Sequence, residues 1–562
     1  MQQRRKVELL APAGNMEKLK TAFHFGADAC FVGGSAFNLR GMSSNFKNSE
    51  LREAIDYVHS LGKKIYVTLN IFAHNSEIEY MPKFIKLLDE YGADAVIVAD
   101  LGVFQLVREN APNLPIHVST QANNTNWMSV KTWRDMGAKR VILAREMSLK
   151  EIKEIKEKVP NIEIEVFIHG AMCMAVSGRC LLSNYFTSRD ANRGICAQDC
   201  RWNYKVIAEG HEEKGAHDII EEQGETFIFN AKDLCTIDFI DKVIETGVDS
   251  LKIEGRMKSI YYNSTVVKQY RKAIDSYYSG NYEYNPEWYK ELQTISHRLY
   301  SKGFYLGKTT EEDQNYNTGN SYSQTYQLVA NVKEKLGNGK YLLQIRNRVF
   351  ADDTLELIRP EGDPIKFKVK NFFNTKTEEY VEVVHPNTIA VIESELEMGP
   401  MDLIRIKLPE GKSVTTYSIK NENADIYAKN IRIVDRKTIF EVYVNKELKG
   451  EFSLNIPGEH NIQNSLPVIY LALKFGLNKD EIQEALNQFK GSKRRYDVLY
   501  DQELENGYGS KTKRVRIIDD YAHHPTEIKA TLKAIKSIDT SRLVAIFQPH
   551  RYSRVHFLLD EF

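Results

Sequence analysis

The sequence has no excess of charge of either sign, because its 76 lysines and arginines balance its 76 aspartates and glutamates. A nucleic-acid partner would therefore need a local basic surface. No apolar run reaches the roughly 18 residues of a membrane-spanning helix, and the start MQQRRKVELLAPAG lacks the apolar core of a signal peptide, so we expect a cytoplasmic protein. At 562 residues, 42% hydrophobic and 27% charged, the composition excludes collagen-like, disordered and disulfide-scaffold classes and predicts about three to four domains.

Several motifs of nucleotide-binding and hydrolytic enzymes are also missing. No G-x-G-x-x-G follows the first predicted strand, which argues against a dinucleotide-binding fold. No G-x-x-x-x-G-K-[ST] loop is present to hold the phosphates of ATP, and the nearest imitation, residues 337–340, is a predicted turn. Neither G-x-S-x-G nor H-E-x-x-H occurs, so the sequence offers no familiar peptidase site.

The first half does contain a repeated alternation of short β-branched runs and amphipathic stretches. Glycines that can end a helix in the left-handed conformation precede several of the runs, at Gly26, Gly62, Gly92, Gly137 and Gly247. The runs predict parallel strands at 7–10, 29–33, 65–70, 95–99, 115–119, 140–144, 163–168, 226–230 and 250–253. Either a closed (β/α) barrel or an open doubly wound sheet fits, and the number of units favours a TIM-like α/β barrel over residues 1–256.

Polar residues directly after these strands are the candidates for a site, because barrel enzymes carry their chemistry where the strands end. They are Asn70, Asp100, Ser119, Gln121, Arg145, Glu146, His169, Asn230, Glu254 and Arg256. The alternative is that several of them only cap the following helices.

The cysteines gather in one segment, residues 169–206, where Cys173, Cys180, Cys196 and Cys200 are spaced by 7, 16 and 4 positions. Four thiolates in an insertion at a barrel rim suit zinc or an iron–sulfur cluster, and the loose first pair favours iron–sulfur over a zinc knuckle. Four buried free thiols remain the alternative. Arg179, Arg193 and Arg201 are cations that lie close to these cysteines in the sequence. Cys235, at the start of a predicted helix, is a weaker fifth candidate ligand, and Cys30 is a predicted core residue.

Three further regions follow the barrel. Residues 257–324 read as helical, and their many tyrosines either stack RNA bases or, as we slightly favour, pack on the barrel. Residues 325–408 alternate in strand fashion and predict a small β-barrel module. The character changes near residue 409, and we divide the remainder into 409–490 and 491–562.

The segments ELLAPAGN (8–15), VFIHGAMCMAVSGRC (166–180), NRGICAQDCRWNY (192–204) and SLKIEGRMKS (250–259) resemble the collagenase-like peptidase family of unassigned catalytic type over about residues 5–408. The resemblance is strongest to a branch that hydroxylates the wobble uridine of tRNA at C5 with prephenate. It implies a [4Fe–4S] cluster on Cys173, Cys180, Cys196 and Cys200, a tRNA partner and an electron donor. Fixed cations for a carboxylate-rich co-substrate are then expected at Arg145 and Arg256, with His169 beside them. A collagenase-like peptidase is the alternative.

The segments IPGEHNIQNSL (456–466), KGSKRRYDV (490–498), IIDDYAHHPTEI (517–528) and FQPHRYSR (547–554) resemble another family, the Mur ligases of peptidoglycan synthesis, in its L-alanine-adding branch. That likeness implies binding of ATP and Mg²⁺ near His460, Asn461, Asn464, Arg495, Asp520, Tyr521 and His524. Because the phosphate loop is absent and the chain ends where the family continues, we expect an incomplete and inactive ligase segment. An active UDP-N-acetylmuramate–L-alanine ligase is the alternative.

Overall fold

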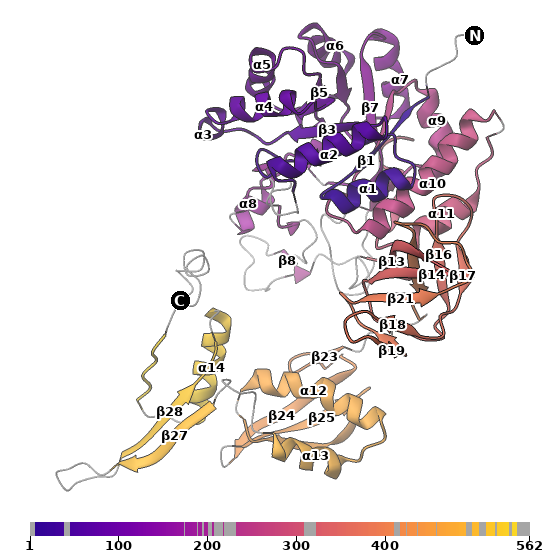
Figure 1. Cartoon of the computed structure of the whole chain (residues 1–562). Coiled ribbons are helices and arrows are strands. Elements are labelled where there is room, and N and C mark those ends of the chain that lie inside the picture. The colour runs from indigo at the N-terminus through magenta and orange to yellow at the C-terminus, as the bar shows by residue number, and fades with distance from the viewer. Residues whose placement is uncertain are drawn as a thin grey trace. The chain divides into compact units, whose positions relative to one another are not determined.

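The computed structural model divides into two compact units, Met1–Glu410 and Gly411–Phe562 (Figure 1). It describes residues 6–38, 45–173, 175–187, 189–193, 196–199, 205–206, 217–218, 232–280, 282–307, 322–409, 416–422, 424–434, 437–456, 458–489, 497–504, 513–522, 525–538 and 542–547. No helix among these residues is long and apolar enough to cross a membrane.

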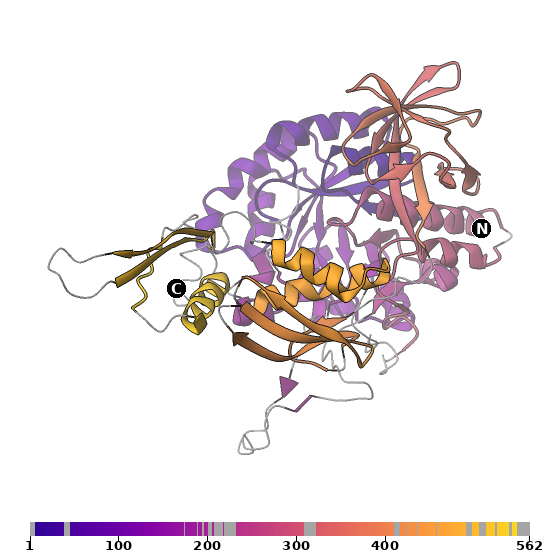
Figure 2. The same cartoon turned by 90° about the horizontal axis from the view of Figure 1, so that it is seen from below.

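Eight parallel strands close into a barrel in the first unit, which confirms the predicted (β/α) barrel. Each strand pairs with the next along the chain, and β7 pairs with the last strand to close the ring. Seen from below, the strands surround a common axis inside a ring of helices (Figure 2). The strands are β1 (Glu8–Pro12), β2 (Ala29–Gly33), β3 (Lys64–Leu69), β4 (Ala95–Val98), β5 (Ile116–Val118), β6 (Arg140–Ile142), β7 (Glu163–Ala171) and β11 (Ser250–Ile253). The expected strand at 226–230 lies outside the described residues.

The helices between the strands begin and end at the signals that the sequence carries. Asn15, Asp100 and Ser148 accept backbone N–H groups at helix starts, and all five predicted glycines have positive φ. The helices around the barrel are α1 (Met16–His24), α2 (Asn48–Ser60), α3 (Asn75–Ile78), α4 (Met81–Glu90), α5 (Leu101–Asn110), α6 (Trp127–Asp135), α7 (Leu149–Lys158), α9 (Ile240–Glu245) and α10 (Ile260–Tyr278).

One barrel strand is longer than the sequence predicts. β7 continues to Ala171 because β10 (Asp233–Cys235) pairs with its end in antiparallel fashion, and β12 (Tyr300–Ser301) pairs with β10. Arg298 forms a buried ion pair with Asp233 at 2.7 Å and fixes this extension. Short elements in the cysteine region are α8 (Leu182–Thr187) and the pair β8 (Lys205–Val206) and β9 (His217–Asp218).

The tyrosine-rich helix α10 packs on the barrel, as favoured above. Tyr261, Tyr262 and Tyr270 are all buried. Together with α11 (Pro286–Leu292), α10 forms the surface on which the next module rests.

Residues 326–407 form the predicted antiparallel module. Its main sheet has the order β17-β16-β22-β13-β14-β21-β18-β19. Buried Arg405 joins the module to the barrel unit, because its guanidinium binds Glu291 on α11 at 2.9 Å and Glu356 at 2.8 Å. The strands are β13 (Tyr326–Gly337), β14 (Lys340–Ile345), β15 (Val349–Phe350), β16 (Leu355–Ile358), β17 (Ile365–Phe367), β18 (Phe372–Asn374), β19 (Glu379–Val381), β20 (Val383–Val384), β21 (Ile389–Glu393) and β22 (Leu403–Lys407).

The second unit is a smaller α/β region with its own core. A four-stranded sheet in the order β23-β24-β25-β26 packs through Phe440, Phe452 and Val442 against two helices. A separate hairpin of β27 and β28 precedes the last helix. The elements are β23 (Tyr417–Ser418), β24 (Ile426–Val434), β25 (Lys437–Val444), β26 (Glu447–Leu454), α12 (Glu459–Lys474), α13 (Lys479–Gln488), β27 (Asp497–Leu504), β28 (Lys513–Asp519) and α14 (Pro525–Ile538).

Candidate functional site

A small cavity of about 70 Å³ opens at the carboxyl ends of the barrel strands. Six of the predicted strand-end residues line it: Asn70, Ser119, Gln121, Arg145, Glu254 and Arg256. Asp100 is not among them, because its carboxylate caps α5 by accepting the amide of Val103. Glu146 is also absent from the lining, and Asn230 lies outside the described residues. The strand ends therefore converge on one site, the mouth cavity, as barrel geometry requires.

Arg256 is almost fully buried beside this cavity. Its guanidinium donates to Thr68 Oγ1 at 3.2 Å and to Asn38 Oδ1. Gly33, at the end of β2, leaves the room that Arg256 needs, since a Cβ there would lie 2.3 Å from an Arg256 nitrogen. The glycine and the arginine thus form a matched pair that fixes a cation at the mouth.

Arg145 approaches the cavity from the end of β6. It donates to the carbonyl oxygen of Ala171 at 2.7 Å, and its guanidinium lies 5.0 Å from the ring centre of Phe167. Both contacts orient the side chain while leaving other N–H groups available, because a guanidinium carries five donors.

A third cation, Lys252, lines the cavity from within β11, and strand-end reasoning missed it. Its ammonium binds Glu165 at 2.9 Å and lies 4.4 Å from the ring centre of Phe31. A lysine inside a short buried strand is the signal that could have found it, because charged groups are buried only where they are paired.

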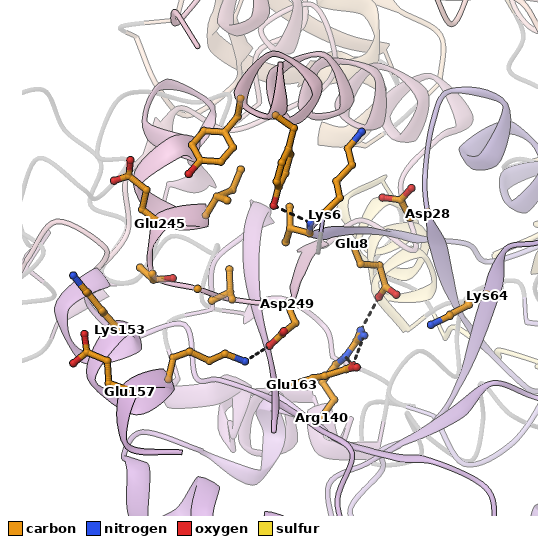
Figure 3. A pocket seen from close by; sticks show the side chains of 18 of the residues that line it. Lys6, Glu8, Asp28, Lys64, Arg140, Lys153, Glu157, Glu163, Glu245 and Asp249 are labelled. Atoms are coloured by element: carbon orange, nitrogen blue, oxygen red, sulfur yellow. Dashed lines mark hydrogen bonds and ion pairs between the residues drawn. The ribbon is translucent and has the colours of Figure 1, made fainter. Parts of the chain in front are cut away.

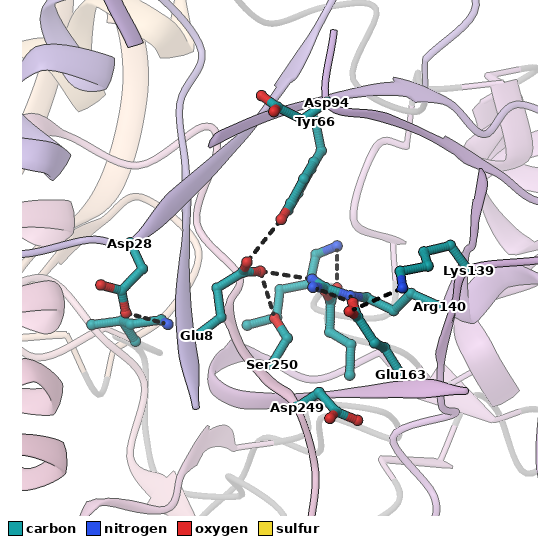
Figure 4. A network of polar contacts seen from close by, with 12 residues as sticks. Glu8, Asp28, Tyr66, Asp94, Lys139, Arg140, Glu163, Asp249 and Ser250 are labelled. Carbon is teal, nitrogen blue, oxygen red and sulfur yellow. Dashed lines mark hydrogen bonds and ion pairs between the residues drawn. The ribbon is translucent and has the colours of Figure 1, made fainter. Parts of the chain in front are cut away.

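Glu165 connects Lys252 to a charge network inside the barrel (Figure 4). Arg140 binds Glu165 at 2.9 Å, Glu163 at 2.8 Å and Glu8 at 2.7 Å, and Tyr66 donates to Glu8 at 2.8 Å. Burial alone would raise the pKa of Glu165, but the charges of Lys252 and Arg140 outweigh burial and hold this pKa below its ordinary value. The carboxylate therefore stays ionised and holds Lys252 in place.

Two amide side chains at the mouth have acceptor atoms that no described donor reaches. These atoms are Asn70 Oδ1 and Gln121 Oε1, and both are buried. A buried acceptor without a donor costs free energy, so these oxygens are suited to a ligand that brings hydroxyl or N–H groups.

Three of the four clustered cysteines lie in the described segments that follow β7. Cys173 and Cys180 are half-buried and Cys196 is exposed, whereas Cys200 lies outside the described residues. Asn192 ties the segments together, because its amide exchanges hydrogen bonds with the backbone of Cys180 at 3.0 and 3.2 Å. The sulfur of Cys196 accepts the amide of Gln198 at 3.3 Å. None of the three thiols is sealed in the barrel core.

The segment of the cysteines reaches the mouth through Arg179. Its Nε donates to the carbonyl of Gln121 at 2.9 Å, and its guanidinium lies 5.3 Å from the ring centre of Phe72. The side chain of Arg193 and all of Arg201 lie outside what the structure describes. Arg179 is thus the described cation that joins the cysteine segment to the mouth cavity.

The two remaining cysteines are core residues. Cys30 is fully buried in β2, as predicted, and burial raises the pKa of its thiol. Cys235 lies on β10 and not at the start of a helix, because the end of β7 pairs with it. Burial raises the pKa of the Cys235 thiol to about 12, and its sulfur lies 3.8 Å from the Tyr270 hydroxyl. A thiol of this kind is poorly suited to bind metal as a thiolate.

His169 lies away from the mouth cavity, because β7 continues past it. Its ring is buried among Tyr262, Tyr270 and Tyr300, with ring centres 5.2 to 5.9 Å apart. Burial lowers the pKa of His169 to about 3, so the ring is neutral at pH 7. The cations are therefore brought together at the mouth without His169.

A larger cavity of about 580 Å³ lies at the opposite end of the barrel (Figure 3). Charged side chains of both signs line it, and many are paired, as Lys156 is with Asp249 and Arg140 with Glu163. This end carries the amino ends of the strands, where barrels place stabilising contacts.

The candidate residues of the second unit fall into two described groups. His460, Asn461 and Asn464 lie on the first turns of α12, and Asp520 and Tyr521 follow β28. Asp520 accepts the amide of Ala522 at 2.8 Å and the hydroxyl of Thr531 at 3.1 Å. Arg495 and His524 lie outside the described residues.

Models of known protein families match residues in both units. The model of peptidase family U32 matches residues 14–315, and the model of its C-terminal domain matches 324–405. The Mur ligase middle domain matches 368–472, which overlaps the preceding match, and the Mur glutamate ligase domain matches 508–561.

Curated relatives give the same division. A tRNA hydroxylation protein P1 of Bacillus subtilis is 41% identical over 406 residues, which are 71% of this chain and 95% of that protein. A collagenase of Porphyromonas gingivalis is 33% identical over 333 residues, 57% of this chain and 78% of that protein. A UDP-N-acetylmuramate–L-alanine ligase of Fusobacterium nucleatum is 86% identical over 156 residues, 28% of this chain and only 33% of the ligase.

Proposed function

Because this chain belongs to peptidase family U32, and because its similarity to a tRNA hydroxylation protein spans nearly all of that relative, we propose that residues 1–408 form a tRNA hydroxylase. The proposed target is C5 of the wobble uridine, where a C–H group becomes C–OH in a two-electron oxidation: water supplies the oxygen, and two electrons and two protons pass to an external acceptor. Such an enzyme works in the cytoplasm. The proposal rests on one observation: Arg145, Lys252 and Arg256 line the mouth cavity, and the cysteine segment reaches it through the contact of Arg179 with Gln121.

The proposal includes a [4Fe–4S] cluster on Cys173, Cys180, Cys196 and Cys200. Cys173, Cys180 and Cys196 lie outside the core, and Asn192 binds the backbone at Cys180, which supports this role. Among the described residues, however, no three His, Cys, Asp or Glu side chains are grouped to hold a metal ion, so the proposal requires the cysteine segments to close around the cluster. The hydrogen bond from Gln198 to the sulfur of Cys196 is a contact that tunes cluster potentials. When bound, such a cluster supplies one-electron redox chemistry, and an external electron donor or acceptor is part of the proposal.

Prephenate is the proposed co-substrate at the mouth cavity. Arg145, Arg256 and Lys252 are the cations that would hold its carboxylates, while Asn70 and Gln121 offer acceptors for its hydroxyl.

The second unit carries a separate proposal. We infer that residues 412–562 form no working ligase by themselves, because they contain no phosphate loop to hold ATP. ATP and Mg²⁺ would then bind weakly or not at all near His460 and Asp520. Isothermal titration with Mg-ATP tests this, and a stoichiometric heat signal would contradict it.

Anaerobic reaction of the purified protein with unmodified tRNA, prephenate and an added electron acceptor tests the hydroxylase proposal. We expect hydroxylated uridine from the wild type and none from Cys173→Ala, whereas the matched core variant Cys30→Ala retains activity. Cleavage of denatured collagen by both variants, with no change in the tRNA, would favour the peptidase alternative instead.

A further inference from the structure

We propose that Lys366, Lys368 and Lys370, on and directly after β17, form the surface with which the module holds the phosphate backbone of tRNA. We call these three residues the lysine row. The inference rests on the proposed function for its partner and adds the place at which that partner docks. Figure 1 shows β17 at the outer side of the module.

The lysines of the row alternate with apolar residues, which separates exposed side chains from buried ones. Lys366, Lys368 and Lys370 are exposed, whereas Val369 is buried and Phe367 packs partly on the module core. Lys366 is the cross-strand partner of Glu356, which binds Arg405. Lys366 therefore lies on the face of the sheet that carries the Glu356–Arg405 contact with the barrel unit, and Lys368 and Lys370 follow directly after the strand.

The ammonium groups of the row have no carboxylate partner within 4.0 Å among the described residues. Two other lysines of the module are paired, Lys335 with Glu397 and Lys340 with Glu393. The sequence explains the contrast, because no aspartate or glutamate occurs between Asp363 and Glu378. In a chain of zero net charge, this is a local basic surface of the kind that RNA requires.

The lysine row places three exposed positive charges within five residues. Lys366 lies on β17, and Lys368 and Lys370 follow the end of that strand at Phe367. A lysine ammonium binds phosphate as a mobile point charge and does not recognise the base. The row would therefore position the tRNA, while the mouth cavity selects the target base.

Contacts on either side hold the row in a fixed position relative to the barrel. Lys272 on α10 binds Asp363 at 3.0 Å, directly before β17. Arg405 binds α11 from the same face, and His24 on α1 lies 3.0 Å from Asp402. A tRNA bound along the row would therefore meet the barrel at a defined distance.

The test is the salt dependence of tRNA binding to the full chain, measured by fluorescence anisotropy with an unmodified tRNA transcript. The variant Lys366→Gln/Lys368→Gln/Lys370→Gln keeps polar, unbranched side chains and removes three charges. We expect the slope of log affinity against log salt to fall by about 2 to 3, and affinity at about 0.1 M salt to fall about 100-fold. The matched control Lys83→Gln/Lys86→Gln/Lys150→Gln removes three exposed charges from α4 and α7 and should leave the slope within about 0.5 of the wild type.

The outcomes separate this inference from the proposed function. An unchanged slope in the row variant, with normal binding and hydroxylation by the wild type, overturns the inference and leaves the function intact. Lysines on an edge strand also prevent sheets from pairing. Self-association of the row variant in light scattering, with an unchanged slope, would assign the row to that role and contradict the docking surface. A wild type that neither binds nor modifies tRNA would instead refute the proposed function.

Discussion

Replacing Glu165 by Gln should destabilise the barrel more than any exposed charge change. Glu165 is fully buried and binds both Arg140 and Lys252 at 2.9 Å, so the amide leaves buried Lys252 without its carboxylate and removes one of the three carboxylates that Arg140 binds. Breaking a buried ion pair in this way costs about 3–5 kcal/mol. The first unit extends to Glu410, which corresponds to an unfolding entropy of roughly 0.9 kcal/mol per kelvin, and the expected fall in Tm is about 3–6 °C.

Differential scanning calorimetry at pH 7 measures this difference. The matched control is Glu397→Gln, which removes the exposed ion pair with Lys335 and should shift Tm by less than about 1 °C. A Glu165→Gln protein that melts within 1 °C of the wild type would show that the interior network does not act as described. The same variant should weaken binding of carboxylates at the mouth, because Glu165 fixes Lys252.

Three further predictions follow from the same contacts. The pKa of Glu165 is lowered in the folded state, so its contribution to the free energy of unfolding should disappear as pH falls below about 4.5. The free energies of unfolding of the wild type and Glu165→Gln should therefore converge in acid titrations. The pKa of His169 is about 3 in the folded protein and 6.5 in the unfolded chain, so the unfolded chain takes up a proton first as pH falls. The free energy of unfolding of the wild type should therefore decrease as pH falls below 6.5, by up to about 1.4 kcal/mol per pH unit. Denaturant titrations of His169→Gln at several pH values should lack this part of the pH dependence. Arg405→Leu leaves Glu291 and Glu356 without their cation and should lower Tm by several degrees, whereas unchanged melting would contradict the described junction.

The barrel could be predicted from the sequence because its signals are local. Each buried strand is a short apolar run, and each of the five glycines takes the left-handed conformation that ends a helix. The mouth residues Arg145 and Arg256 were also predictable, since both directly follow a strand. The positions of these residues depend only on the order of strands around the ring.

The rest depends on pairing between distant segments, which a single sequence does not show. His169 directly follows the run predicted at 163–168, yet β10 pairs with the end of β7 and draws the ring into a cluster of tyrosines. The same pairing places Cys235 in a strand. Lys252 was missed because it lies inside a strand and reaches the mouth only through its ion pair with Glu165. Charged residues within predicted buried strands, such as Arg140, were the available sign of that network.

Nucleoside analysis of tRNA by mass spectrometry, in a strain that lacks this gene, tests the central claim most directly. The account predicts that 5-hydroxyuridine derivatives disappear from the wobble position, that the wild-type gene restores them, and that a gene encoding Cys173→Ala does not. Wobble uridines that remain fully hydroxylated without the gene, in a strain with no second member of the family, would contradict it.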